Sequence, residues 1–472
     1  MFQEQQKSAK PQKTGFLSSP VKLAACIFFS LTILTSAVLS RSAQASTLIY
    51  PIRDAETETL IKDYAVPIFR AAQVGSQNIK IHIIRDLNFN AFVIDGRNMF
   101  IHAGALMKTQ TPNQLIGIIA HETGHIAGGH LAGLRRQISK TRGPALLCQV
   151  LAIMTAAAAV TSGEKSLGGA GLAPLGVCGR LIQRSILSYR RAHESAADQA
   201  ALSYLNATKQ SGRGMLETFE VFADQALASA RYIDPYVQSH PLARQRITQL
   251  RTLARRSPYY KNKDPRSLQF RHDMMRAKII GFMQRPQAVL NKFRDSDQSL
   301  PAQYARAIAY YRSGDLKRSI KALDRMLKVL PNNAYLHEAR GQFLFEKGFS
   351  TQAIPSLRKA LRLAPKEDLI RILLAEVLLA TDNRKYADES IALLRKALVF
   401  ESTNSTAYRL LARAYGIKGK ISHARLASAH RYFYEGNLKG AREQAKWAQR
   451  NLKRGSAAWL QADDILSYRP PS

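Results

Sequence analysis

The chain has 472 residues, a length that predicts two or three domains. Hydrophobic residues make up 46% of it, which is enough for buried cores and excludes a disordered protein. The formal net charge of +35 favours anionic partners, and peripheral contact with an anionic membrane is one expectation. A general basic bias with no specific partner explains the charge equally well. No nucleic-acid-binding motif is present, so we expect no nucleic-acid partner.

The N-terminal 45 residues have the pattern of a secretory signal. Several lysines precede an apolar run over residues 23–39, and Ala43-Gln44-Ala45 follows as a cleavage site. We predict that residues 1–45 are removed and that the protein belongs to a bacterial envelope. An uncleaved membrane anchor is the alternative, because the run is nearly long enough to span a bilayer.

Strand patterns follow a predicted helix within residues 46–75. Residues 79–84 alternate apolar and polar side chains, residues 91–94 are apolar, and Asp95-Gly96 predicts a hairpin turn before a strand around Phe100. We expect a small antiparallel sheet. Its free edge could hydrogen-bond to an extended peptide, or it could serve only as a scaffold.

The next segment, residues 111–125, predicts a helix that carries two histidines. Thr111 is a candidate N-cap, Pro112 a first-turn residue, and Gln114 completes a capping box. His121 and His125 are four residues apart and therefore share a helix face. Two imidazoles so placed can bind one Zn²⁺.

Catalysis at such a site needs a base and a third protein ligand. Glu122, next to the first histidine, can accept a proton from a water molecule. A metzincin would need histidine at 131, but His130 comes one residue early, so that assignment fails. Glu194 and Asp198, four apart on a later predicted helix, can supply the ligand and a carboxylate that holds a histidine ring. An ordinary solvated acidic face is the alternative.

An Ala- and Gly-rich insertion, residues 144–179, lies between these two helices. We expect a helical hairpin or lid over the site, with membrane insertion of residues 144–161 as the alternative. Cys148 and Cys178 flank the insertion, and they could form a disulfide or remain free thiols. Neither cysteine has a zinc-binding spacing.

Beyond residue 262 a repeat with a period of 34 residues appears. Small residues follow five positions after each of four glycines, Gly314, Gly348, Gly419 and Gly436. This spacing is typical of tetratricopeptide repeats, which are stacked helix pairs. A third unit lacks the glycine, and its small residue, Ser390, comes three residues late. We therefore predict a peptidase domain over residues 46–262 and an all-α repeat solenoid over residues 263–472.

The HETGH motif, the Glu194–Asp198 block and a His240-Pro241…Arg246 element resemble the gluzincin family of HtpX-type metallopeptidases. From spacing alone His240 would be a surface turn residue. The resemblance implies instead that it can be a fourth, inhibitory zinc ligand, and that Arg246 orients the substrate or stabilises the transition state. It also implies a substrate-binding strand edge at residues 90–92 (Asn90, Ala91 and Phe92).

The resemblance implies a fold and a role. The fold is mostly helical α+β, with a gluzincin domain followed by the repeat solenoid. The role is that of a zinc endopeptidase, with one Zn²⁺ per chain, in the periplasm of a Gram-negative bacterium. It would degrade misassembled outer-membrane proteins and assist assembly, its repeats binding clients or the barrel-assembly machinery. A catalytically latent chaperone scaffold and an integral-membrane peptidase are the alternatives.

Overall fold

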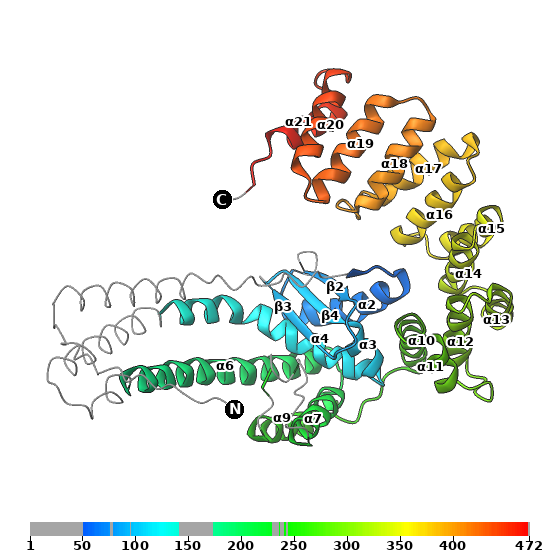
Figure 1. Cartoon of the computed structure of the whole chain (residues 1–472). Helices are drawn as coiled ribbons and strands as arrows, with labels where there is room; N and C mark the ends of the chain where they lie inside the picture. The colour runs from blue at the N-terminus through cyan, green and yellow to red at the C-terminus, as the bar shows by residue number, and fades with distance from the viewer. Residues whose placement is uncertain are drawn as a thin grey trace, which may run out of the picture. The chain divides into compact units, whose positions relative to one another are not determined.

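The computed structural model describes residues 51–75, 79–94, 96–140, 173–228, 236, 240–241 and 244–470 (Figure 1). The predicted signal peptide, residues 1–45, lies outside them, as do residues 144–172 of the insertion, Cys148, Asp95 and the side chain of Cys178. Among the described helices, none is both long enough and apolar enough to cross a membrane.

The N-terminal part of the described chain combines a small sheet with several helices. Its strands are β1 (Pro51–Ile52), β2 (Lys80–Ile84), β3 (Ala91–Ile94) and β4 (Asn98–His102). Its helices are α2 (Ala55–Ala71), α3 (Ala103–Lys108), α4 (Pro112–Ala127), α6 (Ala173–Ala207), α7 (Arg213–Ala228) and α9 (Arg244–Arg256).

The sheet is mixed, which corrects the prediction of an antiparallel one. Its strand order is β1-β2-β4-β3. The pairs β1–β2 and β3–β4 are antiparallel, but β2 and β4 are parallel, with Ile83 opposite Ile101. The reason lies in the β3–β4 hairpin, whose second strand takes the place beside β2. After β2 the chain therefore passes the position of β4 and forms β3 as the terminal strand of the sheet. It then turns back as β4, between β3 and β2.

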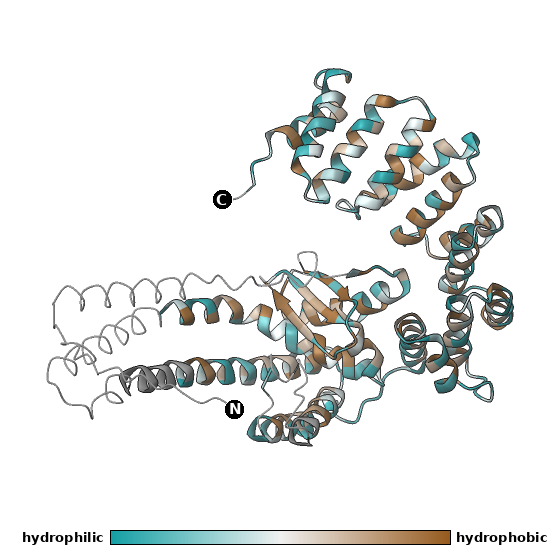
Figure 2. Ribbon diagram, in the orientation of Figure 1, coloured by the Kyte–Doolittle hydropathy of each residue, from teal (hydrophilic) through white to brown (hydrophobic). Residues whose placement is uncertain are grey.

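One hydrophobic cluster joins the sheet to the helices around it. Met99 and Ile101 alternate with more exposed residues along β4, and both are fully buried. Helix α2 contributes Leu60, Tyr64 and Ile68, which lie on one helical face. Figure 2 shows hydrophobic residues concentrated on the strands of this sheet. The cluster thus supports α4, which packs against α2, α6, α7 and β3.

Helix pairs make up the rest of the chain. They are α10 (Arg266–Met283), α11 (Pro286–Lys292), α12 (Leu300–Arg312), α13 (Leu316–Val329), α14 (Ala334–Glu346), α15 (Ser350–Leu363), α16 (Asp368–Ala380), α17 (Ala387–Ala397), α18 (Ser405–Ile417), α19 (Ile421–Tyr434), α20 (Leu438–Arg450) and α21 (Ala457–Ser467). Consecutive helices from α11 to α21 pack on each other, as expected for tetratricopeptide repeats.

The four repeat glycines all have positive φ angles, from 69° to 91°. Gly314, Gly348 and Gly419 fall just after the first helix of a pair, and Gly436 falls just after α19. At each place a left-handed residue ends the helix. Between α16 and α17, Asp382 takes the corresponding place with φ 54°. A 3-10 turn, η2 (Arg384–Tyr386), is then inserted before α17, and these three residues account for the delay of Ser390.

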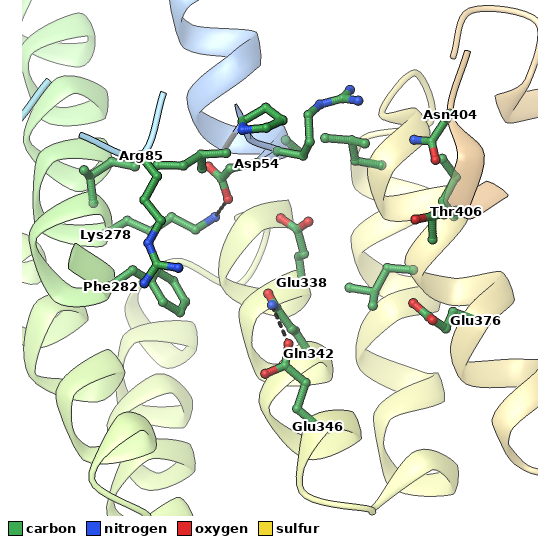
Figure 3. A pocket seen from close by; sticks show the side chains of 18 of the residues that line it. Asp54, Arg85, Lys278, Phe282, Glu338, Gln342, Glu346, Glu376, Asn404 and Thr406 are labelled. Atoms are coloured by element: carbon green, nitrogen blue, oxygen red, sulfur yellow. Dashed lines mark hydrogen bonds and ion pairs between the residues drawn. The ribbon is translucent and has the colours of Figure 1, made fainter. Parts of the chain in front are cut away.

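The repeat helices contact the N-terminal part through a buried charged cluster. Lys278 of α10 lies 2.5 Å from Asp54, the N-cap of α2, and 3.3 Å from Glu56. A cavity of about 910 Å³ adjoins this cluster and is lined by residues 51–55 and by helices that include α10, α14 and α16 (Figure 3). Glu338 of α14 faces this cavity.

Candidate metal centre

Helix α4 begins as its sequence predicts. The Thr111 side chain accepts a hydrogen bond from the Gln114 amide, and Pro112 occupies the first turn. The reciprocal bond of the expected capping box is displaced, because the Gln114 side chain accepts from the Gln110 amide at 2.6 Å. His121 and Glu122 lie two turns further on and are completely buried.

Four side chains bring potential ligand atoms within 4.8 Å of one another: His121, His125, Glu194 and His240. Nε2 of His121 is 3.1 Å from Nε2 of His125. Carboxylate oxygens of Glu194 lie 3.4 Å from each of these two nitrogens. The structure therefore brings together the two helices that the sequence proposed as sources of ligands.

The fourth member, His240, is buried, with 6% of its surface exposed. The expectation of a surface turn residue is therefore wrong. Its Nδ1 is 3.3 Å from Nε2 of His121 and 3.1 Å from Oε2 of Glu194. Its other nitrogen, Nε2, lies 3.4 Å from Oε1 of Glu122. His240 thus stands between the candidate ligands and the candidate base.

Asp198 and Arg246 form the layer behind the ligands. Oδ1 of Asp198 is 3.0 Å from Nδ1 of His121, as the sequence proposed for a ring-holding carboxylate. Arg246 donates to Asp198 from Nε at 2.5 Å and from Nη2 at 2.8 Å, and its Nη1 lies 2.8 Å from Glu194. All three charged residues are less than 8% exposed. Each charge therefore depends on the others for compensation.

This arrangement shifts the pKa values of several groups. Burial raises the pKa of Glu122, which favours its uptake of a proton. Burial alone would also raise the pKa of Glu194, but the charges and hydrogen bonds of His240 and His121 lower it far below its usual range. Burial lowers the pKa of His121, but Asp198 and Glu194 outweigh this effect and raise it to about 9.

The donor set fits zinc. Two atoms bound at about 2.0–2.1 Å from a tetrahedral centre lie about 3.3–3.4 Å apart. The distances between the donor atoms, 3.1–3.4 Å, are close to this value. Imidazole nitrogens and one carboxylate are common zinc donors.

The predicted substrate edge lies at β3. Ala91 is buried, and Phe92 stacks on Phe100 of β4 with ring centroids 5.2 Å apart. Strand β3 pairs with β4 on one side, ends the sheet, and contacts α4. Asn90 is next to the strand, and its carbonyl accepts from the His102 amide at 2.9 Å.

Three aromatic residues at the site were not anticipated in these roles. Tyr236 is fully buried, one helical turn before His240, and its ring centroid is 4.8 Å from that of His240. The ring of Phe219 lies under the Arg246 guanidinium, 5.2 Å away. His130, rejected as a metzincin ligand, contacts His125 instead. The spacing of four residues between Tyr236 and His240 was the one available signal for the tyrosine.

Comparisons with known proteins match two regions of this chain. Residues 51–254 match the family model "Peptidase family M48", and residues 304–368 match a tetratricopeptide repeat model. The chain thus combines an M48 peptidase region with tetratricopeptide repeats. The predicted fold class is confirmed, except that the sheet is mixed and not antiparallel. The matches support a metallopeptidase.

Two related proteins carry more specific names than the family model. A Vibrio cholerae protein named putative beta-barrel assembly-enhancing protease is 27% identical over 54% of this chain and 52% of its own length. The Escherichia coli K12 beta-barrel assembly-enhancing protease is 24% identical over 79% of this chain and 75% of its own length. The chain therefore spans about half of the first relative and three quarters of the second.

A crystal structure of MamA aligns with 34% of this chain and 90% of its own. The sequence identity is 21% and the TM-score 0.27, a likeness too low to support an argument.

Proposed function

We propose that the protein is a zinc-dependent endopeptidase whose metal is held by His121, His125 and Glu194. The observation that carries this proposal is the convergence of these three donors beside the buried carboxylate of Glu122. The peptidase domain would cover residues 46–262 and the repeat domain residues 263–472.

Zinc, when bound, supplies a Lewis acid that polarises a peptide carbonyl and makes water more acidic. Glu122 is the general base in this proposal. It accepts a proton from the attacking water and passes it to the leaving amine. Its burial supports the role. Burial raises the pKa of Glu122 toward the working pH, where a carboxylate is a more effective general base.

Asp198 and Arg246 complete the proposed machinery. Asp198 holds the Nδ1–H of His121 and so keeps its Nε2 directed at the metal. Arg246 fixes Asp198 and approaches Glu194, which supports a role in orienting the site and the substrate.

Substrate would bind along β3, with Asn90, Ala91 and Phe92 at the edge of the sheet. An extended peptide can pair with a terminal strand through its backbone, independent of its side chains. The contact between β3 and α4 supports this placement, because it brings the edge close to the metal helix.

We further propose a location and clients, by analogy with the named relatives. The chain would act in the periplasm after loss of residues 1–45, degrade misassembled outer-membrane proteins and assist their assembly. The repeat helices would bind these clients or the barrel-assembly machinery.

A second candidate function is a latent scaffold for assembly. It is favoured by His240, whose Nδ1 lies as close to His121 as a fourth ligand would. In that state the imidazole takes the position that a substrate needs. The chemistry would then be suppressed, and binding by the repeats would be the main activity.

The test is cleavage of casein by purified, zinc-loaded residues 46–472, with Glu122→Gln and His240→Ala as variants. Cleavage that is lost in Glu122→Gln supports the endopeptidase, and faster cleavage by His240→Ala supports inhibition by that histidine. If zinc binds with the expected stoichiometry but neither wild type nor His240→Ala cleaves, the endopeptidase proposal fails and the scaffold remains.

A further inference from the structure

One of the proposed metal ligands, His125, also contacts a further histidine, His130. Nε2 of His125 faces His121 and Glu194, which leaves its Nδ1 for another contact. That Nδ1 is 3.0 Å from Nδ1 of His130. The distance is that of a hydrogen bond between two ring nitrogens, one of which must carry the proton.

The proposed role of His125 as a zinc ligand determines which of the two rings donates this hydrogen bond. A neutral imidazole that binds metal through Nε2 carries its proton on Nδ1. His125 is therefore the donor, and Nδ1 of His130 is the acceptor. His130 then carries its own proton on Nε2. The two rings stand nearly perpendicular, with an interplanar angle of 83°.

Neighbouring residues pack closely against the His130 ring. A Cβ atom on Gly128 would come within 2.2 Å of His130 Nε2, so a larger residue there would force the imidazole out of this position. Gly128 has φ −75°, which any residue adopts, so its backbone does not explain the glycine. From α6, the ring of His193 lies 4.1 Å from that of His130, and Tyr189 lies 4.1 Å from His193.

We propose that His130 is a positioning residue for the metal site, accepting the Nδ1–H of His125 and holding that ring with Nε2 toward the other ligands. The inference rests on the proposed zinc site. The two histidine ligands are thus oriented by different groups: His121 by the carboxylate of Asp198 and His125 by a neutral imidazole. Partners of this kind typically change metal affinity by about 10–100-fold when removed.

The experiment measures zinc affinity of residues 46–472 by competition with a chromophoric chelator. His130→Leu should bind zinc about 10–100-fold more weakly than wild type. His130→Asn should recover most of this loss, because its amide oxygen can lie near the position of Nδ1. Gly128→Ala should also weaken binding, since it displaces the ring without altering it.

His193→Leu is the matched control, because it removes the ring that contacts His130 edge-on but leaves the bond between His130 and His125. Its affinity should stay within about threefold of wild type. Thermal unfolding of each metal-free variant checks that the fold is retained. Equal affinities of His130→Leu and wild type, or of His130→Leu and His130→Asn, would overturn the proposal.

A second readout does not depend on affinity. In zinc-loaded protein labelled with ¹⁵N-histidine, two-bond correlation spectra should show His130 protonated on Nε2 and His125 on Nδ1. A proton on Nδ1 of His130 would contradict the proposed direction. Wild-type protein that binds no zinc would refute the proposed function itself, a result distinct from a variant that binds as tightly as wild type.

Discussion

Arg246 of α9 donates two hydrogen bonds to Asp198 of α6, at 2.5 and 2.8 Å, from a position where both side chains are buried. Burial would raise the pKa of Asp198, but the hydrogen bonds and charge of Arg246 outweigh it and hold the pKa below its usual value. This ion pair joins two helices behind the proposed metal ligands.

Arg246→Ala should therefore destabilise the protein strongly. It leaves Asp198 and Glu194 buried without their cation, and breaking such a pair costs about 3–5 kcal/mol. Urea unfolding monitored by circular dichroism measures the change. Arg251→Ala, which removes a more exposed pair with Glu220, should cost less than about 1 kcal/mol. Similar losses in the two variants would contradict the structure.

Removal of zinc should lower the melting temperature. A ligand that binds only the folded state stabilises it by about 4 kcal/mol when its free concentration is a thousand times Kd. Differential scanning calorimetry with and without a chelator tests this. Glu122→Gln should keep the stabilisation by zinc, because Glu122 is proposed as a base, whereas His121→Ala should lose it. Equal zinc responses in these two variants would argue against the assigned ligands.

Because of Glu338, which lines the cavity of Figure 3, we expect the stability of the protein to depend on pH. Burial raises its pKa to about 8, against 4.5 in an ordinary setting, although Lys278 partly opposes this. A raised pKa adds stability below pH 4.5 that is lost as the pH rises to 8. Glu338→Gln resembles the neutral acid, so it should match wild type near pH 5 and exceed it at pH 8.5, by at least about 1 kcal/mol.

Urea unfolding of both proteins across this pH range is the measurement. A constant difference between wild type and Glu338→Gln at every pH would show that Glu338 does not titrate in this way.

We expect a substitution of Asp382, between α16 and α17, to stabilise the protein. It has φ 54°, a conformation that costs roughly 1 kcal/mol for a residue with a Cβ atom and little for glycine. Asp382→Gly should stabilise the protein by somewhat less, because the exposed ion pair with Arg413 is lost. Gly348→Ala, at φ 88°, should destabilise it. The melting temperatures of the two variants should move in opposite directions.

The sequence by itself determined the features that depend on neighbours along the chain. The cap of α4, the shared face of His121 and His125, and the repeat glycines follow from helical periodicity and from the conformations allowed to each residue. The late Ser390 was visible in the sequence, although the turn that causes it was not.

The tertiary structure decided which strands are neighbours and what surrounds the metal ligands. Strand order depends on packing between distant segments, so the parallel pair β2–β4 had no local signal. Burial of His240 beside Glu194 likewise arises where separate elements meet. Local sequence fixes the direction in which a side chain leaves its helix, but its partners come from contacts that only the folded chain brings together.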